Sequence, residues 1–420
     1  MAAKIKKISA REILDCRGLP TIESMVQLSD GIVASASCPS GTSVGTYEAV
    51  ELRDHDAKHF LGKGVLKAIE NINTIIAPKL TGMDPQKQPD IDKLLIELDG
   101  TQNKGHLGAN ATLAVSMAVC RAAAASALLP LFLHIRQFIK RENLPAKIPT
   151  PIFNIINGGL HAGGNLDFQE FIIVPASSIS YVNAIQMAVA IYFSLADVLK
   201  QNGYATLVGN EGGFGPNLTK NSEAFELITR AVTNANYRIG YDVFLGLDAA
   251  ANSFHKNNAY TIKESPKGLS GDEIIKVYDE LNKIYNILYL EDPLSEDDWD
   301  TWVKLAKVVS PKTLLIGDDL TVTNPYRLQM AIDKQAISGI IIKPNQIGTV
   351  IEALAVIEVA REANLKIIIS HRSGETNDDF IADFAVAASA DYVKFGAPAR
   401  GERVAKYNRL LAIENQLKSI

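Results

Sequence analysis

Residues 339–343 read Gly-Ile-Ile-Ile-Lys, a short apolar run that ends in a residue able to move a proton. Five further runs in the second half of the chain also end in a residue able to hold a metal ion or carry a proton: 243–248, 287–291, 313–318, 366–371 and 392–394. With Lys343, their last residues are Asp248, Glu291, Asp318, His371 and Lys394. After a first interval of 43 residues, the intervals are 23 to 28 residues long, which fits one strand, one helix and two turns.

This spacing predicts a barrel of parallel strands, in which the carboxyl ends of the strands share one mouth. Three carboxylates, two lysines and a histidine at that mouth indicate a metal-assisted proton-transfer site. The first two strands of the barrel should be antiparallel and not parallel. Residues 152–157 and 170–174 read as strands joined by a Gly-rich loop that is too short for a crossover helix. The predicted fold is therefore α/β: a (β/α)8 TIM-type barrel opening with an antiparallel strand pair.

A smaller α+β domain is expected before the barrel. Residues 4–9, 21–28 and 31–37 alternate apolar and polar side chains around turn signals, which predicts a three-stranded antiparallel meander. From about residue 58 to 138 the apolar spacing becomes helical. A proline-rich stretch at 143–151 marks the boundary, giving predicted domains of 1–142 and 143–420.

Composition narrows the class of protein. A chain of 420 residues with 47% hydrophobic content is globular, and its net charge of −5 argues against a nucleic-acid or anionic-membrane binder. Cys16, Cys38 and Cys120 suit neither a disulfide framework nor a zinc site, so we expect a cytoplasmic location. The start lacks a signal peptide's apolar core. Arg121 and Pro130 interrupt the apolar stretch 113–133, which we interpret as a buried helix and not a membrane span.

Asp248, Glu291 and Asp318 are the candidate metal ligands. Oxygen ligands without His or Cys suit a hard cation such as Mg²⁺. The alternative is that each acid only caps the following helix. The neighbours Asp292 and Asp319 favour the metal, because a second carboxylate can orient a ligand.

Lys343 is the candidate general base. At the end of an apolar strand its amine would be partly desolvated, and a nearby metal and Lys394 would lower its pKa further. Alternatively, it is an ion-pair partner of Asp319 or Glu291.

The other site candidates lie in loops and at further strand ends. His371-Arg372-Ser373 offers an anion clamp of one guanidinium and one hydroxyl. Glu211 lies in the turn-rich stretch 209–214, Gln169 and Glu170 end the predicted hairpin loop, and His161 lies within it. Residues 40–45, Ser-Gly-Thr-Ser-Val-Gly, suggest a lid more than a phosphate loop.

A set of ordered motifs then points to one family. They are 40–48, 157–162, 169–171, 211–213, 291–292, 317–320, 343–348, 370–376, 396–400 and 403–408. The most specific is Ser370-His371-Arg372-Ser373-Gly374-Glu375-Thr376. On these motifs the chain resembles the enolase family nearly end to end.

The resemblance implies a Mg²⁺-dependent lyase that reversibly dehydrates 2-phosphoglycerate to phosphoenolpyruvate in glycolysis and gluconeogenesis. It implies Lys343 as base, Glu211 as acid, and two Mg²⁺ ions, the second arriving with substrate. It also implies a homodimer or an octamer assembled from dimers, with a surface or secreted pool in some members. The implied metal ligands are Asp248, Glu291, Asp318 and Ser43, and the implied substrate-binding residues are His161, Gln169, Glu170, Arg372, Ser373, Lys394 and His371.

The chain departs from the family pattern at several positions, of which Asn210 matters most because the family has Asp there. An adjacent carboxylate would raise the pKa of Glu211, so we expect Asn210 to weaken the acid at neutral pH. Val44, Leu160 and Phe395 are further departures. Two other functions stay open: a racemase or cycloisomerase of the same superfamily, although no Lys-x-Lys pair ends a strand here, and a weakly active paralogue retained for binding.

Overall fold

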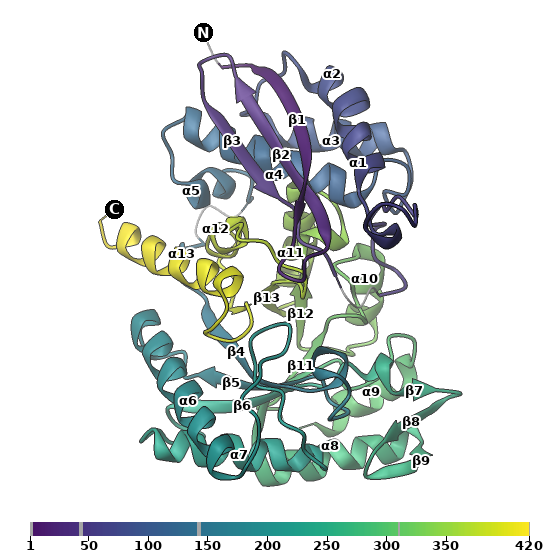
Figure 1. The fold of residues 1–420 in the computed structure, drawn as a ribbon, viewed down its shortest axis with the longest axis vertical. Coiled ribbons are helices and arrows are strands. Elements are labelled where there is room, and N and C mark those ends of the chain that lie inside the picture. Colours follow the sequence, from purple (N-terminus) through teal and green to yellow (C-terminus); the bar gives the residue numbers. More distant parts are fainter. Residues whose placement is uncertain (1–2, 42–44, 141–143, 310, 420) are drawn as a thin grey trace.

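The structure, a computed structural model, describes residues 3–41, 45–140, 144–309 and 311–419. Figure 1 shows the purple and blue elements of a small domain gathered on one side of the molecule and the teal, green and yellow elements of a barrel beyond them. The predicted boundary at 142/143 falls on residues outside the described ranges and stays a prediction.

The small domain contains the predicted meander. Strands β1 (Ile5–Leu14), β2 (Pro20–Leu28) and β3 (Val33–Ser37) pair antiparallel in that order. β1 is longer than the sequence predicts because its last residues continue the register, with Leu14 opposite Pro20. Helices pack on one face of this sheet (Figure 1): α4 (Ala109–Ser126) on β2 and β3, and α1 (Leu66–Asn71), α2 (Ala77–Leu80) and the short helical turn η2 (Ile72–Ile76) on β1. Helices α3 (Gln88–Asp99) and α5 (Leu131–Arg136) pack on α4, and the turn η1 (Phe60–Gly62) precedes α1.

Helix α4 confirms the buried helix predicted in the stretch 113–133. It is Ala-rich, which favours a helix, and nearly every residue is buried against the meander and the barrel side. Arg121 is partly exposed and pairs with Asp378 and Asp379 of the barrel, and the last two residues, Ala125 and Ser126, are also not buried. Among the described helices, α6 (Tyr181–Gln201) alone has the length and apolar composition to cross a membrane, a test that core helices of soluble proteins also pass. α6 packs on β4 and β5.

The second part of the chain forms a closed barrel of eight strands, as predicted. Around the barrel, the order is β10-β11-β12-β13-β14-β4-β5-β6. The strands are β4 (Thr150–Asn157), β5 (Glu170–Pro175), β6 (Val243–Asp248), β10 (Ile287–Glu291), β11 (Leu314–Gly317), β12 (Gly339–Ile342), β13 (Lys366–Ser370) and β14 (Tyr392–Lys394).

Strand β5 runs opposite to both of its neighbours, which confirms the antiparallel opening pair. Its first residue, Glu170, lies opposite Asn157 at the end of β4 and Asp248 at the end of β6. The reversal therefore places the start of β5 at the same mouth as the ends of the parallel strands.

The alternation of side chains explains why the strand ends carry the chemistry. Ile341 of β12 packs inside the barrel, whereas Ile340 and Ile342 pack outward against the helices. Both faces of the strand are thus buried, which accounts for its uninterrupted apolar sequence. Because strand side chains alternate with period two, the next inward position after Ile341 is Lys343. The same count from Tyr289 leads to Glu291.

Helices surround the barrel and complete the predicted alternation. They are α6, α7 (Asn221–Asn234), α8 (Gly271–Tyr285), α9 (Trp299–Val308), α10 (Pro325–Asp333), α11 (Val350–Glu362), α12 (Phe380–Ala387) and α13 (Gly401–Leu417), with short turns η3 (Gly159–Ala162), η4 (Ala251–Ser253) and η5 (Pro344–Gln346). A small antiparallel sheet of β7 (His255–Lys256), β8 (Ala259–Ile262) and β9 (Ser265–Leu269) lies between β6 and α8. This sheet explains the long first interval between strand ends.

The small domain caps the start of barrel helix α11. Ser116 Oγ accepts a hydrogen bond from the Val350 amide (3.1 Å), and Asp92 Oδ2 accepts one from the Ile351 amide (2.9 Å). The first amides of a helix have no partner within the helix. Two side chains of the small domain therefore fix the element that follows β12 and Lys343.

Candidate active site

The barrel mouth contains a small polar cavity of about 30 Å³. Every predicted site residue except Glu291 and Ser43 lines it, together with Ser370. Glu291 lies beneath, in contact with Lys394, and Ser43 lies outside the described residues. The fold thus brings the predicted residues together, although their individual roles stay predictions. The lining residues are His161, Gln169, Glu170, Glu211, Asp248, Asp318, Lys343, Ser370, His371, Arg372, Ser373 and Lys394.

The Lys394 ammonium lies among three buried carboxylates. Its Nζ is 3.1 Å from Glu170 Oε2, 2.9 Å from Asp248 Oδ2 and 2.8 Å from Glu291 Oε2. Burial lowers the pKa of Lys394, but the three carboxylates outweigh it and raise the pKa well above its usual value. Burial and the charge of Asp248 raise the pKa of Glu291 to about 8. The carboxylates of this mouth consequently favour any cation placed among them.

Lys343 forms a buried ion pair with Asp318. Burial lowers the pKa of Lys343, but the Asp318 carboxylate more than offsets burial, so the net pKa is raised. The predicted lowering is wrong for this arrangement, because the pairing with Asp318 is not visible in the sequence. The partner also differs from the predicted alternatives, Asp319 and Glu291.

The acids at the strand ends are not helix caps. The residues at the N-caps of α8, α9 and α10 are Ser270, Asp298 and Asn324. This removes the simplest alternative to metal binding for Asp248, Glu291 and Asp318.

The donors at the mouth fit a hard cation. Carboxylate oxygens of Asp292, Asp318 and Asp319 lie within 4.8 Å of one another, and Asp318 Oδ1 is buried without a hydrogen-bond partner among the described residues. This close group differs from the predicted set, since Lys394 bridges Asp248 and Glu291 instead. All of these donors are oxygen, the ligand type that Mg²⁺ prefers.

Asp292 organises the loop that carries Asp318. Its carboxylate accepts hydrogen bonds from the amides of Asp318 (2.9 Å) and Asp319 (2.6 Å). The sequence predicts such support from the paired acids, and the structure shows that it acts through the backbone.

Glu170 and Glu211 form the proton-holding part of the site. Burial and the charge of Glu211 raise the pKa of Glu170 well above its usual value. Burial would also raise the pKa of Glu211, but His161 and His371 more than offset it and the pKa is lowered. Two like charges so close cannot both ionise freely, and the opposite directions of the two pKa shifts favour Glu170 as the residue that carries the proton of the pair.

The Gly-rich loop before and after Glu211 permits close backbone packing. A Cβ on Gly213 would lie 2.7 Å from Asn157 Oδ1, and Gly212 has a φ of +89°, which only glycine adopts without strain. Asn154 Nδ2 donates to Glu211 Oε2 (3.2 Å). These contacts hold Glu211 over the end of β4 and the start of β5.

The predicted anion clamp is tied to the small domain. Arg372 donates to Glu48 from Nη1 (2.9 Å) and Nη2 (3.1 Å), and Glu48 also accepts from the Gly45 amide (3.0 Å) and Gln346 (3.2 Å). From the sequence, Glu48 is recognised only as a member of the motif 40–48, with no role of its own. Its bridging position has no local sequence signal, because it depends on where two domains meet.

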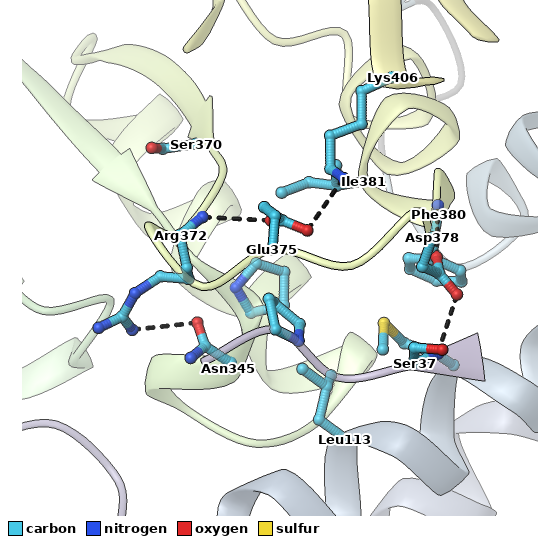
Figure 2. Close-up of a pocket in the computed structure, with 13 residues that line it drawn as sticks. Ser37, Leu113, Asn345, Ser370, Arg372, Glu375, Asp378, Phe380, Ile381 and Lys406 are labelled. Atoms are coloured by element: carbon cyan, nitrogen blue, oxygen red, sulfur yellow. Dashed lines mark hydrogen bonds and ion pairs between the residues drawn. The ribbon is translucent and has the colours of Figure 1, made fainter. Parts of the chain in front are cut away.

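The back of the 371–376 loop is supported by a buried ion pair. Figure 2 shows Glu375 accepting a hydrogen bond from the Arg372 amide (3.2 Å) and pairing with Lys406 (2.9 Å), beside a mostly apolar cavity under the loop. The same view shows the Arg372 guanidinium reaching Asn345 Oδ1 (3.1 Å). Both faces of the loop are therefore fixed.

A closed β/α barrel with a reversed second strand and an acidic, lysine-containing mouth defines a class of proton-transfer barrel enzymes. Comparison with known families agrees: residues 145–420 match the family described as "Enolase, C-terminal TIM barrel domain", and residues 5–135 match "Enolase, N-terminal domain". The chain therefore belongs to the enolase family, and it is a lyase-type enzyme.

Proposed function

We propose that the protein catalyses the reversible, Mg²⁺-dependent dehydration of 2-phosphoglycerate to phosphoenolpyruvate. The supporting observation is the arrangement of the mouth: Lys343 and the carboxylate groups of Asp248 and Asp318 line one cavity with Glu170 and Glu211, and burial and Glu211 raise the pKa of Glu170. Elimination of water needs both groups, a base for the α-proton and an acid for the leaving hydroxyl.

Lys343 is the proposed base. A proton next to a carboxylate is weakly acidic, and Mg²⁺ held by Asp248, Glu291 and Asp318, with a second ion beside Ser43, would stabilise the negative charge that its removal creates. Lys343 accepts that proton at Nζ once its own is lost. Whatever draws Asp318 away from Lys343 lowers the lysine pKa toward neutrality, because Asp318 is the group that raises it.

The remaining residues bind substrate and deliver the second proton. The Glu170/Glu211 pair supplies the proton for the departing hydroxyl: Glu211 is the proposed donor, and it takes the proton from Glu170, whose pKa is the raised one. Arg372 and Ser373 offer donors for a phosphate, and His161, Gln169, His371 and Lys394 complete the walls of the cavity.

Replacing Lys343 by Ala tests this assignment. We expect phosphoenolpyruvate formation from 2-phosphoglycerate and Mg²⁺ to fall by about 10²- to 10⁴-fold, the usual contribution of a general base. A chelator should also abolish the wild-type rate. The reaction is followed by the absorbance of the product.

The matched control is Lys366→Ala. Lys366 begins β13 at the opposite end of the barrel, and its side chain is half exposed, so the rate should not change. A Lys343→Ala rate equal to wild type would contradict the base assignment. Absence of product from wild-type protein at any pH would instead favour another acid substrate of the superfamily or a binding role.

The cytoplasmic location also stays a proposal. Its support is that Cys16, Cys38 and Cys120 are free thiols, as expected in a reducing compartment. Subcellular fractionation tests it, and a protein found only outside the cell would contradict it.

A further inference from the structure

Arg403, in the first turn of α13, is a fully buried side chain that does not line the cavity. Its Nη1 contacts His371 Nδ1 (2.8 Å) and the Arg372 carbonyl (2.6 Å). Its Nη2 donates to the carbonyls of Ser373 (2.7 Å) and Asn210 (3.1 Å). One guanidinium thus joins the two loops that carry His371 and Glu211.

The contact with His371 determines where the imidazole proton lies. A guanidinium only donates hydrogen bonds, so His371 Nδ1 must accept. Nδ1 is then unprotonated, and in the neutral ring the proton lies on Nε2. Nε2 faces Glu211, with 3.6 Å between Nε2 and Oε2.

The surroundings hold the ring in this position. A Cβ on Gly396 would lie 2.9 Å from His371 Cε1 and 2.7 Å from the Glu211 carbonyl oxygen, so the ring and the Glu211 loop are packed closely together. The His371 amide also donates to the Lys394 carbonyl (2.9 Å). The ring has little room to turn over and exchange its two nitrogens.

The charged groups that face His371 oppose one another. Burial and Arg403 lower its pKa, Glu211 and Glu375 raise it, and the result is a pKa of about 4. The ring is consequently neutral at physiological pH.

We propose that Arg403 is a positioning residue that fixes His371 as the Nε2–H tautomer, a hydrogen-bond donor aimed at the Glu211 side of the cavity. By holding the Asn210 carbonyl as well, Arg403 also sets the spacing between the imidazole and the carboxylate. His371 then donates a hydrogen bond and stores no proton, so the proton for the leaving hydroxyl comes from the Glu170/Glu211 pair. Only this last step depends on the proposed function.

Nitrogen NMR of protein labelled with ¹⁵N-histidine reads the tautomer directly and requires no activity. The His371 signals are assigned by their loss in His371→Gln. At neutral pH we expect Nε2 to be protonated and Nδ1 not. A protonated Nδ1, alone or together with Nε2, would overturn the proposal.

Substitution of Arg403 tests its part in this arrangement. In Arg403→Met, which keeps a long side chain without donors, we expect the second tautomer to become populated. The control is Arg409→Met on the same helix, where Arg409 pairs with Asp383 (2.6 Å) away from the cavity and the tautomer should not change. An unchanged tautomer in a folded Arg403→Met protein would refute the role of Arg403.

If Arg403→Met does not fold, a pair of variants at His371 decides the question. The amide NH₂ of Gln reaches the position of Nε2, whereas that of Asn lies at the position of Nδ1. We expect His371→Gln to retain at least about tenfold more kcat than His371→Asn, with a smaller difference in KM. Equal or reversed kcat values would contradict the proposal. If wild-type protein makes no phosphoenolpyruvate, the proposed function fails and the NMR result alone decides the tautomer.

Discussion

At the scale of single residues, the position of the proton between Glu170 and Glu211 is the feature of the site that responds most to neighbouring charge. Its distribution depends on which charges lie nearby, and His161 and His371 both favour the ionised form of Glu211. Asn210 precedes Glu211 and adds no charge. Its carbonyl is fixed by Arg403, so a side-chain change at this position need not move the loop.

Replacing Asn210 by Asp should raise the pKa of Glu211 through like-charge repulsion. The Glu170/Glu211 pair would keep its proton to higher pH, so the alkaline limb of kcat against pH should move upward by up to about one unit, with a faster rate at neutral pH. The measurement is the pH–rate profile. Asn257→Asp, in the exposed turn between β7 and β8, is the control for added charge. An unchanged profile would show that residue 210 does not tune the acid.

The residues that the sequence identifies and those it misses differ in how they reach the mouth. Glu291 and Lys343 follow apolar strands at the inward phase of a period-two alternation, which is readable from the chain. Glu48 and Arg403 reach the site through contacts with distant segments, 324 residues away in the case of Glu48 and Arg372, and leave no periodic signal. The raised pKa of Lys343 is hidden for the same reason, because it depends on a partner from another strand.

At the scale of elements, α11 depends on the small domain for its start. Its own N-cap, Thr349, accepts from the Glu352 amide (3.2 Å), and Ser116 and Asp92 satisfy the next free amides. Burial raises the pKa of Asp92 from 3.8 to about 7. This cap therefore makes stability depend on pH.

The direction in which stability changes with pH follows from the number of protons that the folded and unfolded states bind. Between about pH 4 and 7 the folded state keeps a proton on Asp92 that the unfolded state has lost, so the free energy of unfolding falls as pH rises through this window. Below the window the contribution is fully present. In Asp92→Asn this dependence disappears, and the stability of wild type relative to the variant should fall by up to about 1.4 kcal/mol per pH unit.

Urea unfolding of both proteins at several pH values measures this difference. The control is Asp90→Asn. Asp90 is an exposed acid in the first turn of α3, the helix that also carries Asp92, and its replacement should show no such trend. A relative stability that rises with pH would contradict the raised pKa of Asp92.

At this scale, a strand or helix was predictable from the sequence when its pattern of apolar and turn residues was long enough to recognise. The antiparallel pair β4–β5 is visible because a short Gly-rich loop excludes a crossover helix. The sheet of β7, β8 and β9 is visible only as an interval that is too long, because strands of two to five residues are too short for their alternation to be recognised.

At the scale of the whole molecule, the meander presents one face that the described chain does not cover. Helix α4 packs on one side of β2 and β3, while Met25 of β2 and Val33 of β3 are exposed on the other side. The dimer that family membership suggests stays a proposal, and this open face is a surface of the small domain on which a second copy can be sought.

Light scattering during gel filtration tests the assembly. We expect a mass of about twice the 45.5 kDa chain, or a multiple of that dimer if octamers form. A single-chain mass at micromolar concentration would contradict the dimer. Catalytic activity measured on the same fractions shows which species is active.

The reversed strand β5 also means that some site contacts join residues close in sequence, whereas others join residues far apart in sequence. His161 and Glu170 lie 3.9 Å apart within one local hairpin, whereas Lys394 meets Asp248 across 146 residues of chain. Closing a short loop costs less chain entropy than closing a long one. The hairpin of β4 and β5 can thus organise during folding well before the carboxylates are joined to the last strand. The ion pairs of Lys394 with Asp248 and Glu291 form only when β14 closes the barrel.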